Sequence, residues 1–310
     1  MSYKFSHHHL LDTDVLSKAD IKAILNLADV YAKQNRSPKK KREKCWGKTA
    51  VNLFFENSTR TRTSFEIAAK RLGADVVNIP VALSSTAKGE SLMDTALTLD
   101  AMQIDALIIR HPDEGAPERI SKCVQAHVIN AGDGTHAHPT QALLDAMTIR
   151  RHKKKLEGLT VAIVGDLARS RVARSNIHIL KKFGATIRVV APDYFMSPDY
   201  ETMGVEICPT LEAGIKDADA IIMLRIQHER PGLPFNFAAR KTEYIASYGL
   251  SHTKLKAARP NAIVLHPGPT NRGIELTDEL ADDPEHSVIR EQVELGVAIR
   301  MAVIDLLTSQ

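Results

Sequence analysis

The sequence predicts an α/β protein with two parallel-sheet domains and helices on both faces of each sheet. Short apolar segments rich in β-branched residues alternate with segments whose apolar residues recur at helical spacing, in both halves of the 310-residue chain. Such alternation is typical of parallel strands that are connected by helices. A closing helix, residues 288–307, is expected to return to the first domain. Both domains are therefore expected to be Rossmann-like.

The domain boundary is expected where the composition changes. A basic segment at residues 151–155 precedes an apolar segment at residues 159–164. We therefore assign residues 1–140 with 288–310 to the first domain and residues 141–287 to the second.

Bulk composition excludes several classes of protein. Hydrophobic residues make up 44% and charged residues 25%, as is typical of a globular protein. No apolar run reaches the ~18 residues needed to span a bilayer, and a net charge of +4 is too small to indicate a nucleic-acid partner. Cys45, Cys123 and Cys208 lack metal or redox spacing, which predicts free thiols in a reducing cytoplasm.

The first candidate site follows the predicted strand at residues 49–55. Residues 58–61 read Ser-Thr-Arg-Thr, and helical spacing begins at residue 61. A helix N-terminus offers N–H groups and the positive end of its dipole to an anion, and a guanidinium matches two phosphate oxygens. A helix cap followed by surface arginines is the alternative. The predicted phosphate ligands are Ser58, Thr59, Arg60 and Thr61.

Charged side chains also follow other predicted strands. Arg110 follows residues 106–109, and Arg225 follows residues 220–224. Ligands of open α/β sheets bind beyond the carboxyl ends of the strands. Arg110 is therefore placed to add a second guanidinium to the phosphate site, with a solvent-exposed arginine as the alternative.

The second domain begins like a dinucleotide-binding unit but lacks its fingerprint. The strand at residues 159–164 leads into Gly165 without the Gly-x-Gly-x-x-Gly pattern, which argues against a dehydrogenase. The loop is instead rich in arginine, at Arg169, Arg171 and Arg174. A guanidinium in such a loop suits a carboxylate ligand. Physical reasoning alone does not separate Arg171 from Arg174, for which a helix-face salt bridge is the alternative.

Five separated motifs resemble the aspartate and ornithine carbamoyltransferase family. They are residues 58–66, Lys-Gly-Glu-Ser at 88–91, Arg110 with His111, His-Pro-Thr-Gln at 138–141, and Arg171 with Arg225 and His-Pro-Gly-Pro at 266–269. The resemblance covers nearly the whole chain. It implies transfer of the carbamoyl group of carbamoyl phosphate to an amine, without a metal or an organic cofactor.

The turn at residues 266–269 indicates which amine is the acceptor. Ornithine enzymes, as a family, carry His-Cys-Leu-Pro here, whereas this chain has Pro267 at the cysteine position. The turn resembles that of the aspartate enzymes, which implies L-aspartate as acceptor, N-carbamoyl-L-aspartate and phosphate as products, and a role in de novo pyrimidine biosynthesis. An ornithine enzyme and a non-catalytic sensor of a phosphate ligand on the same fold are the alternatives.

The resemblance implies a role for each candidate residue, with carbamoyl phosphate in the first domain and aspartate in the second. The catalytic set is Arg60, Thr61, Lys88, Arg110 and His138. Carbamoyl phosphate would be bound by Ser58, Thr59, Arg60, Thr61, Arg110, His138, Gln141, Gly268 and Pro269. Aspartate would be bound by Lys88, Arg171, Arg225 and Gln227.

The loop that carries Lys88 bears on assembly. In this family the Lys-Gly-Glu-Ser loop reaches the active site of the neighbouring subunit, so the resemblance implies a cytoplasmic homotrimer with shared sites. Catalytic trimers of the family occur alone, with regulatory chains or with dihydroorotase-like partners, and the sequence does not separate these assemblies.

Overall fold

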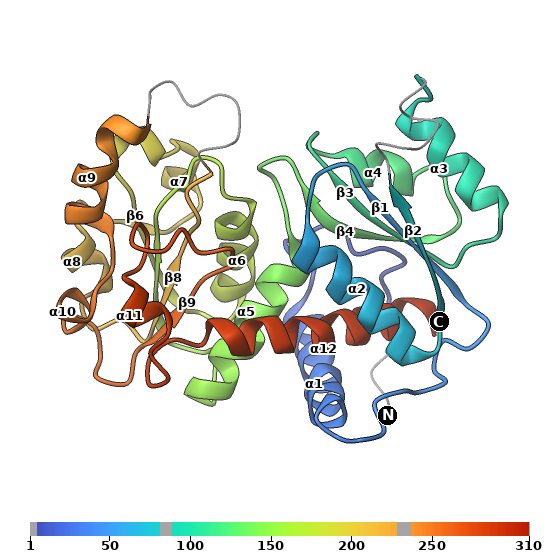
Figure 1. Ribbon diagram of the computed structural model, residues 1–310, viewed down its shortest axis with the longest axis horizontal. Helices are drawn as coiled ribbons and strands as arrows, with labels where there is room; N and C mark the ends of the chain where they lie inside the picture. Colours follow the sequence, from blue (N-terminus) through green and yellow to red (C-terminus); the bar gives the residue numbers. More distant parts are fainter. Residues whose placement is uncertain (1–4, 81–88, 228–236, 310) are drawn as a thin grey trace. The chain divides into compact units, whose positions relative to one another are not determined.

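A computed structural model describes residues 5–80, 89–227 and 237–309 (Figure 1). The chain divides into two compact units, Met1–Leu144 with Val293–Gln310 (unit 1) and Asp145–Gln292 (unit 2). Each unit is built around one parallel sheet, which confirms the predicted fold class. Among the described residues, no helix is long and apolar enough to cross a lipid bilayer.

Unit 1 contains a four-stranded sheet in the order β2-β1-β3-β4. All of its strand pairs are parallel. Two helices, α5 and α12, contain residues of both units. The elements are α1 (Lys18–Asn35), β1 (Thr49–Phe54), α2 (Thr59–Leu72), β2 (Asp75–Pro80), α3 (Leu92–Ala101), β3 (Ala106–His111), α4 (Ala116–Ser121), β4 (His127–Asp133), α5 (Pro139–Lys153) and α12 (Ile289–Thr308).

Helices cover both faces of this sheet because its strands are apolar on both sides. Val51, Leu107 and Val128 pack on one face against Leu99 of α3 and Ile120 of α4. On the other face α2 and α12 lie side by side (Figure 1), with the Arg300 guanidinium 5.0 Å from the centre of the Phe65 ring.

The C-terminal helix returns to the first unit, as the sequence predicts. The Tyr31 hydroxyl of α1 donates a hydrogen bond of 2.5 Å to the Asp305 carboxylate of α12. Near the end of α12, the Thr308 carbonyl accepts a hydrogen bond from Lys48, directly before β1. These contacts attach the helix to both α1 and the start of the sheet.

Unit 2 contains a five-stranded parallel sheet in the order β7-β6-β5-β8-β9. Ala162, Ile221 and Val264 pack on one face against Leu211 and Ile215 of α8. The elements are β5 (Thr160–Val164), α6 (Arg171–Lys182), β6 (Thr186–Val190), the short 3₁₀ helix η3 (Asp193–Phe195), α7 (Asp199–Thr202), β7 (Glu206–Ile207), α8 (Leu211–Ile215), β8 (Ala220–Met223), α9 (Phe237–Tyr248), α10 (His252–Leu255), β9 (Ile263–Leu265) and α11 (Asp278–Ala281).

Candidate active site

Each sheet has one place where the strand order reverses direction. In unit 1 the chain adds β2 on one side of β1 and β3 on the other, and in unit 2 it adds β6 on one side of β5 and β8 on the other. Ligands of open parallel sheets bind beyond the carboxyl ends of the strands at such a switch point. Residues 58–61, Arg110, Arg171, Arg225 and Gln227 of the predicted site lie at or after the carboxyl ends of β1, β3, β5 and β8.

The N-terminus of α2 follows β1 directly. The helix begins at Thr59, two residues before the predicted start, so Arg60 and Thr61 lie in its first turn. Ser58 is the N-cap residue, but its hydroxyl does not cap the helix, and the first turn contains no acidic residue. Thr59 and Arg60 are exposed and Thr61 is buried. This turn offers backbone N–H groups, hydroxyls and a guanidinium to an anion.

The second guanidinium of unit 1 lies at the end of β3. This strand extends to His111, so Arg110 lies within it, beside Phe54 of β1, and not after it. Arg110 Nε donates to Glu56 Oε2 at 2.9 Å, and these side chains are 14% and 19% exposed. Glu56 neutralises the guanidinium, so a phosphate at this edge competes with that carboxylate. The adjacent His111 ring packs 4.7 Å from Phe55, and burial lowers the pKa of this imidazole.

His138 and Gln141 lie at the N-terminus of α5. The His138 carbonyl accepts hydrogen bonds from the backbone N–H groups of Gln141, at 3.0 Å, and Ala142, at 3.2 Å. Pro139 is the first residue of the helix, where its missing N–H has no cost. Both predicted side chains are buried, with His138 4% and Gln141 7% exposed. The first turn of α5 therefore places both side chains in the interior.

A buried carboxylate shapes the loop that leads to His138, and the sequence analysis missed it. Asp133 accepts hydrogen bonds from the N–H groups of Gly115 and Ala137 and from the Asn130 amide, at 2.8, 3.1 and 2.8 Å. Its carboxylate also lies 3.0 Å from His136 Nδ1. The hydrogen bonds with His136, Asn130 and Gly115 outweigh burial and lower the pKa of Asp133. The sequence contained a signal for this residue, because Gly-Asp-Gly at residues 132–134 ends four residues before His138, the first residue of the His-Pro-Thr-Gln motif.

In unit 2, α6 begins at Arg171 after β5. Ser170 caps this helix by accepting a hydrogen bond from the Ala173 N–H at 3.1 Å, and Arg171 is only 5% exposed. Arg174, one turn later, donates to the Asp199 carboxylate at 2.6 Å. Arg174 therefore forms the salt bridge that was its alternative in the sequence.

The loop after β5 is tied to the segment after β8. Arg169 donates two hydrogen bonds to the fully buried Asp166 carboxylate, at 3.2 and 2.6 Å. Gln227 Nε2 donates to the Arg169 carbonyl at 2.9 Å. Burial raises the pKa of Asp166, although the Arg169 guanidinium opposes this rise. The hydrogen bonds from Arg169 to Asp166 and from Gln227 to the Arg169 carbonyl were not predicted. Gln227 lies 58 residues from Arg169 along the chain, so their contact is not a local property of the sequence.

A third buried carboxylate, Glu275, joins the segment that carries Arg225 to Asn271, which follows the turn at residues 266–269. Glu275 is fully buried and accepts a hydrogen bond from the Ile226 N–H at 2.9 Å and another from the Asn271 N–H at 2.7 Å. Burial raises the pKa of this carboxyl. Arg225 is half-buried beside this connection. Glu275 thus holds together two segments that carry predicted ligands.

The turn at residues 266–269 combines a glycine of positive φ with a cis peptide bond. Gly268 has a φ of +68°, in the left-handed region that favours glycine, and the Gly268–Pro269 peptide bond is cis. The Gly268 N–H donates to His266 Nδ1 at 2.9 Å. The His266 side chain is therefore used inside the turn. The remaining predicted residue, Lys88, lies outside the described residues.

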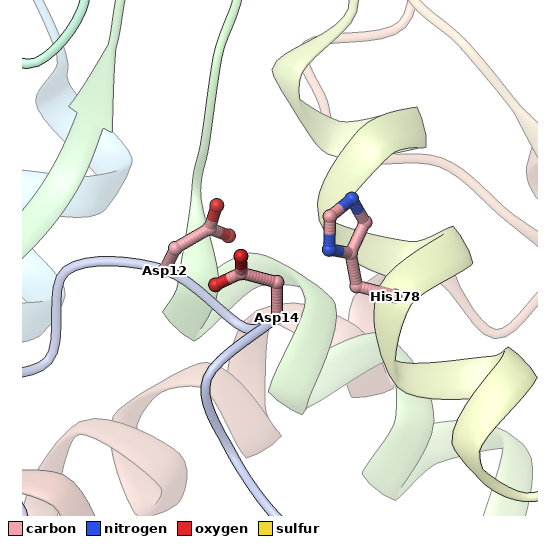
Figure 2. Close-up of side chains that lie close together, drawn as sticks. All are labelled: Asp12, Asp14 and His178. Atoms are coloured by element: carbon pink, nitrogen blue, oxygen red, sulfur yellow. The ribbon is translucent and has the colours of Figure 1, made fainter. Parts of the chain in front are cut away.

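The N-terminal segment carries acidic side chains away from these residues. Asp12 and Asp14 line a hollow of about 570 Å³ in unit 1, and none of the predicted site residues lines it. Figure 2 shows both carboxylates together with His178, which belongs to α6 of unit 2. Within either unit taken alone, the described His, Cys, Asp and Glu residues provide no group of three close enough to hold a metal ion.

Comparisons with known proteins cover nearly the whole chain. Residues 8–151 match the carbamoyl-P binding domain of the aspartate/ornithine carbamoyltransferases, and residues 157–307 match their Asp/Orn binding domain. The aspartate carbamoyltransferase catalytic subunit of Rhodospirillum centenum is 56% identical over 98% of this chain and 95% of that protein. The corresponding subunit of Granulibacter bethesdensis is 53% identical over 99% and 96%.

Solved structures agree with these relatives. Aspartate transcarbamoylase from Trypanosoma cruzi in complex with aspartate and phosphate has a TM-score of 0.86 at 32% identity, covering 96% of each chain. The same enzyme in complex with carbamoyl phosphate and aspartate has a TM-score of 0.85, also at 32% identity and 96% coverage of each chain. With both halves matched in sequence and structure, the chain belongs to the aspartate and ornithine carbamoyltransferase family.

Proposed function

We infer that this protein transfers the carbamoyl group of carbamoyl phosphate to the amine of L-aspartate, which yields N-carbamoyl-L-aspartate and phosphate for pyrimidine biosynthesis. One observation carries this inference: the switch point of each sheet presents the groups that one substrate needs. Unit 1 presents a helix N-terminus with Arg60 and Arg110 for a phosphate. Unit 2 presents Arg171 and Arg225 after β5 and β8, which suits the two carboxylates of aspartate.

The reaction needs charge stabilisation more than a protein nucleophile. The aspartate amine attacks the carbonyl carbon, a C–N bond forms, and the carbonyl oxygen gains negative charge. Arg60, Thr61 and His138 donate to this oxygen in the proposed mechanism. Preorganised donors of this kind are often the largest single contribution to catalysis, with about 10²–10³-fold in rate lost when one is removed. The burial of Thr61 and His138, which limits the access of water to their polar groups, supports this assignment.

The leaving group is stabilised at the same edge of the sheet. The C–O bond to the phosphate breaks, the phosphate takes the bonding electrons, and it accepts the proton that the amine releases. Arg60, Arg110 and the first turn of α2 neutralise this charge. Gln141 and the backbone carbonyls near Gly268 and Pro269 accept hydrogen bonds from the NH₂ group of the carbamoyl moiety.

The acceptor is oriented by unit 2. Arg171 and Arg225 each bind one carboxylate of aspartate, and Gln227 contributes to the same site from the segment after β8. The hydrogen bond from Gln227 to the Arg169 carbonyl supports this role, because it attaches that segment to the loop that precedes Arg171. Lys88 of a neighbouring subunit completes the site in a cytoplasmic homotrimer. This trimer acts alone, with regulatory chains or with dihydroorotase-like chains, and these three assemblies stay alternatives.

The experiment that tests this function is a carbamoyl-transfer assay with aspartate and ornithine in parallel. We expect turnover with carbamoyl phosphate and aspartate, and none above background with ornithine. Turnover with ornithine alone would overturn the substrate assignment. Binding of carbamoyl phosphate without turnover on either amine would instead favour the sensor alternative.

A further inference from the structure

A chain of buried hydrogen bonds in unit 2 ends on the turn at residues 266–269. The His266 N–H donates to Gln292 Oε1 at 2.9 Å, and Gln292 Nε2 donates to Asp145 Oδ1 at 2.7 Å. The other oxygen of the same carboxylate, Asp145 Oδ2, accepts a hydrogen bond from Asn176 Nδ2 at 2.8 Å. Asp145 and Asn176 are fully buried, and Gln292 and His266 are each 2% exposed. None of these contacts is on the surface, where water would compete for them.

The donors and acceptors in this series of hydrogen bonds allow only one orientation of the Gln292 amide. A backbone N–H only donates, so the Gln292 side chain must present its oxygen to His266. An ionised carboxylate only accepts, so Asp145 draws the NH₂ group of Gln292 and fixes the amide in that orientation. Asn176 donates to the same carboxylate and also to the Val172 carbonyl of α6, which holds the carboxylate in place.

The turn itself transmits this constraint to Gly268. His266 Nδ1 accepts the Gly268 N–H at 2.9 Å, so the orientation of the His266 backbone and ring sets the peptide that follows. The Gly268 and Pro269 carbonyls belong to the same short turn. A shift of His266 therefore moves the carbonyls that accept the carbamoyl NH₂ group in the proposed function.

We propose that Asp145 and Gln292 are positioning residues that hold the 266–269 turn so that its carbonyls select an acyl phosphate carrying an NH₂ group. The inference rests on the proposed function, since it assumes carbamoyl phosphate as the ligand. A site built to accept hydrogen bonds from a ligand N–H discriminates against an analogue that lacks it, because the acceptors are left without a partner. Acetyl phosphate is such an analogue, with a methyl group in place of the NH₂ group.

The test measures the Kd values of carbamoyl phosphate, acetyl phosphate and inorganic phosphate by calorimetry, for the full chain in its native assembly. In the unaltered protein we expect carbamoyl phosphate to bind more tightly than acetyl phosphate. In Asp145→Asn one acceptor oxygen becomes an NH₂ group at nearly constant side-chain volume, so residue 145 can no longer accept from both Gln292 and Asn176, and the Gln292 amide is held less firmly. We expect about 5–10-fold weaker carbamoyl phosphate binding, as for one lost hydrogen bond, with acetyl phosphate and inorganic phosphate within about twofold.

A second variant and a matched control sharpen this result. Gln292→Leu removes the acceptor for His266 and should lower the ratio of the two acyl phosphate affinities in the same way. Gln34→Leu makes the same change in unit 1, where Gln34 is 7% exposed and binds Lys40 and Arg42, and should leave the ratio unchanged. Thermal unfolding establishes which variants are folded. If Gln292→Leu does not fold, the affinity ratio of Asp145→Asn alone tests the proposal.

Two outcomes would overturn the proposal: an unchanged ratio in folded Asp145→Asn, or equal weakening of all three ligands, which would mean a general structural role. Failure of the proposed function looks different. In that case the unaltered protein itself would not bind carbamoyl phosphate, or would bind it no better than acetyl phosphate.

Discussion

Two arginines of α6 in unit 2 have different surroundings, although they lie close together in the sequence. Arg171 and Arg174 lie three residues apart on α6, yet only Arg174 donates to Asp199 and lies 5.7 Å from the centre of the Tyr200 ring. Both residues are arginines of the same helix, so the elements that surround them determine which one pairs with Asp199. This pair of arginines provides a controlled test of the aspartate site.

We expect Arg171→Gln to raise the KM for aspartate by about 10–100-fold, as for a hydrogen bond to a charged group that is worth ~1.5–3 kcal/mol. The KM for carbamoyl phosphate should change much less. Arg174→Gln is the matched control and should change the KM for aspartate by less than about threefold, since its salt bridge is partly exposed. Steady-state kinetics with each substrate varied in turn measure both values. An equal effect of the two substitutions would contradict the assignment.

His136 provides a residue-scale prediction about pH. Its ring lies 3.3 Å from the Asp12 carboxylate and 3.0 Å from that of Asp133, and hydrogen bonds to these two carboxylates raise its pKa to about 10. A pKa raised in the folded state stabilises the protein fully below the unfolded value of about 6.5. That contribution is lost as the pH rises through about 10.

Urea unfolding of the unaltered protein and His136→Gln at pH 6.5 and pH 10 measures this contribution. The unaltered protein should be the more stable at pH 6.5, and its advantage should shrink at pH 10. Solvent screens the ring, which is 46% exposed, so the advantage should stay below about 1 kcal/mol. An advantage that is the same at both pH values would show that the imidazole does not titrate in this way.

At the scale of elements, the start of α2 differs from the start of α1. Ser17 caps α1 in a capping box with Asp20, whereas the Ser58 hydroxyl makes no capping hydrogen bond to α2. The phosphate site was predicted because residues 58–61 join a strand to a helix. The structure adds that the Ser58 hydroxyl makes no hydrogen bond that would cap this helix.

This difference predicts opposite effects for two identical substitutions. Ser17→Ala should lower the free energy of unfolding by about 0.5–2 kcal/mol, the usual cost of a lost cap, and leave phosphate binding unchanged. Ser58→Ala should change stability by less than about 0.5 kcal/mol and weaken phosphate binding several-fold. Denaturant unfolding and phosphate calorimetry on both variants measure these effects. A large loss of stability in Ser58→Ala would mean that its hydroxyl serves the fold.

At the scale of the whole molecule, the proposed homotrimer predicts that two inactive variants restore activity when their subunits are mixed. If Lys88 acts in the site of a neighbouring subunit, a mixed trimer of Lys88→Ala and His138→Ala chains contains some sites with neither substitution. Each variant alone should be nearly inactive. Mixing them after reversible dissociation should restore a fraction of the activity, measured with carbamoyl phosphate and aspartate. If no activity returns although mixed trimers form, each site is built from one chain.

The fold class was predictable because strands and helices bury their apolar residues with different periods. The match of β1 and α12 to the predicted ranges within two residues follows from this local signal. Shorter elements such as α4, β7 and α11 were missed, since so few residues carry too little periodicity. The start of α2 was placed late for a related reason: polar residues in a first turn resemble a loop.

The sequence alone determined the two-domain α/β architecture and the polar motifs after each strand, because hydrophobic periodicity and motif spacing are local properties of the chain. Only the tertiary structure decided how these motifs are supported. Asp133, Asp145, Asp166 and Glu275 are buried carboxylates that each accept a hydrogen bond from a separate segment of the chain. A buried carboxylate is stable only when its oxygens are satisfied, and which groups satisfy them depends on how the chain folds back on itself.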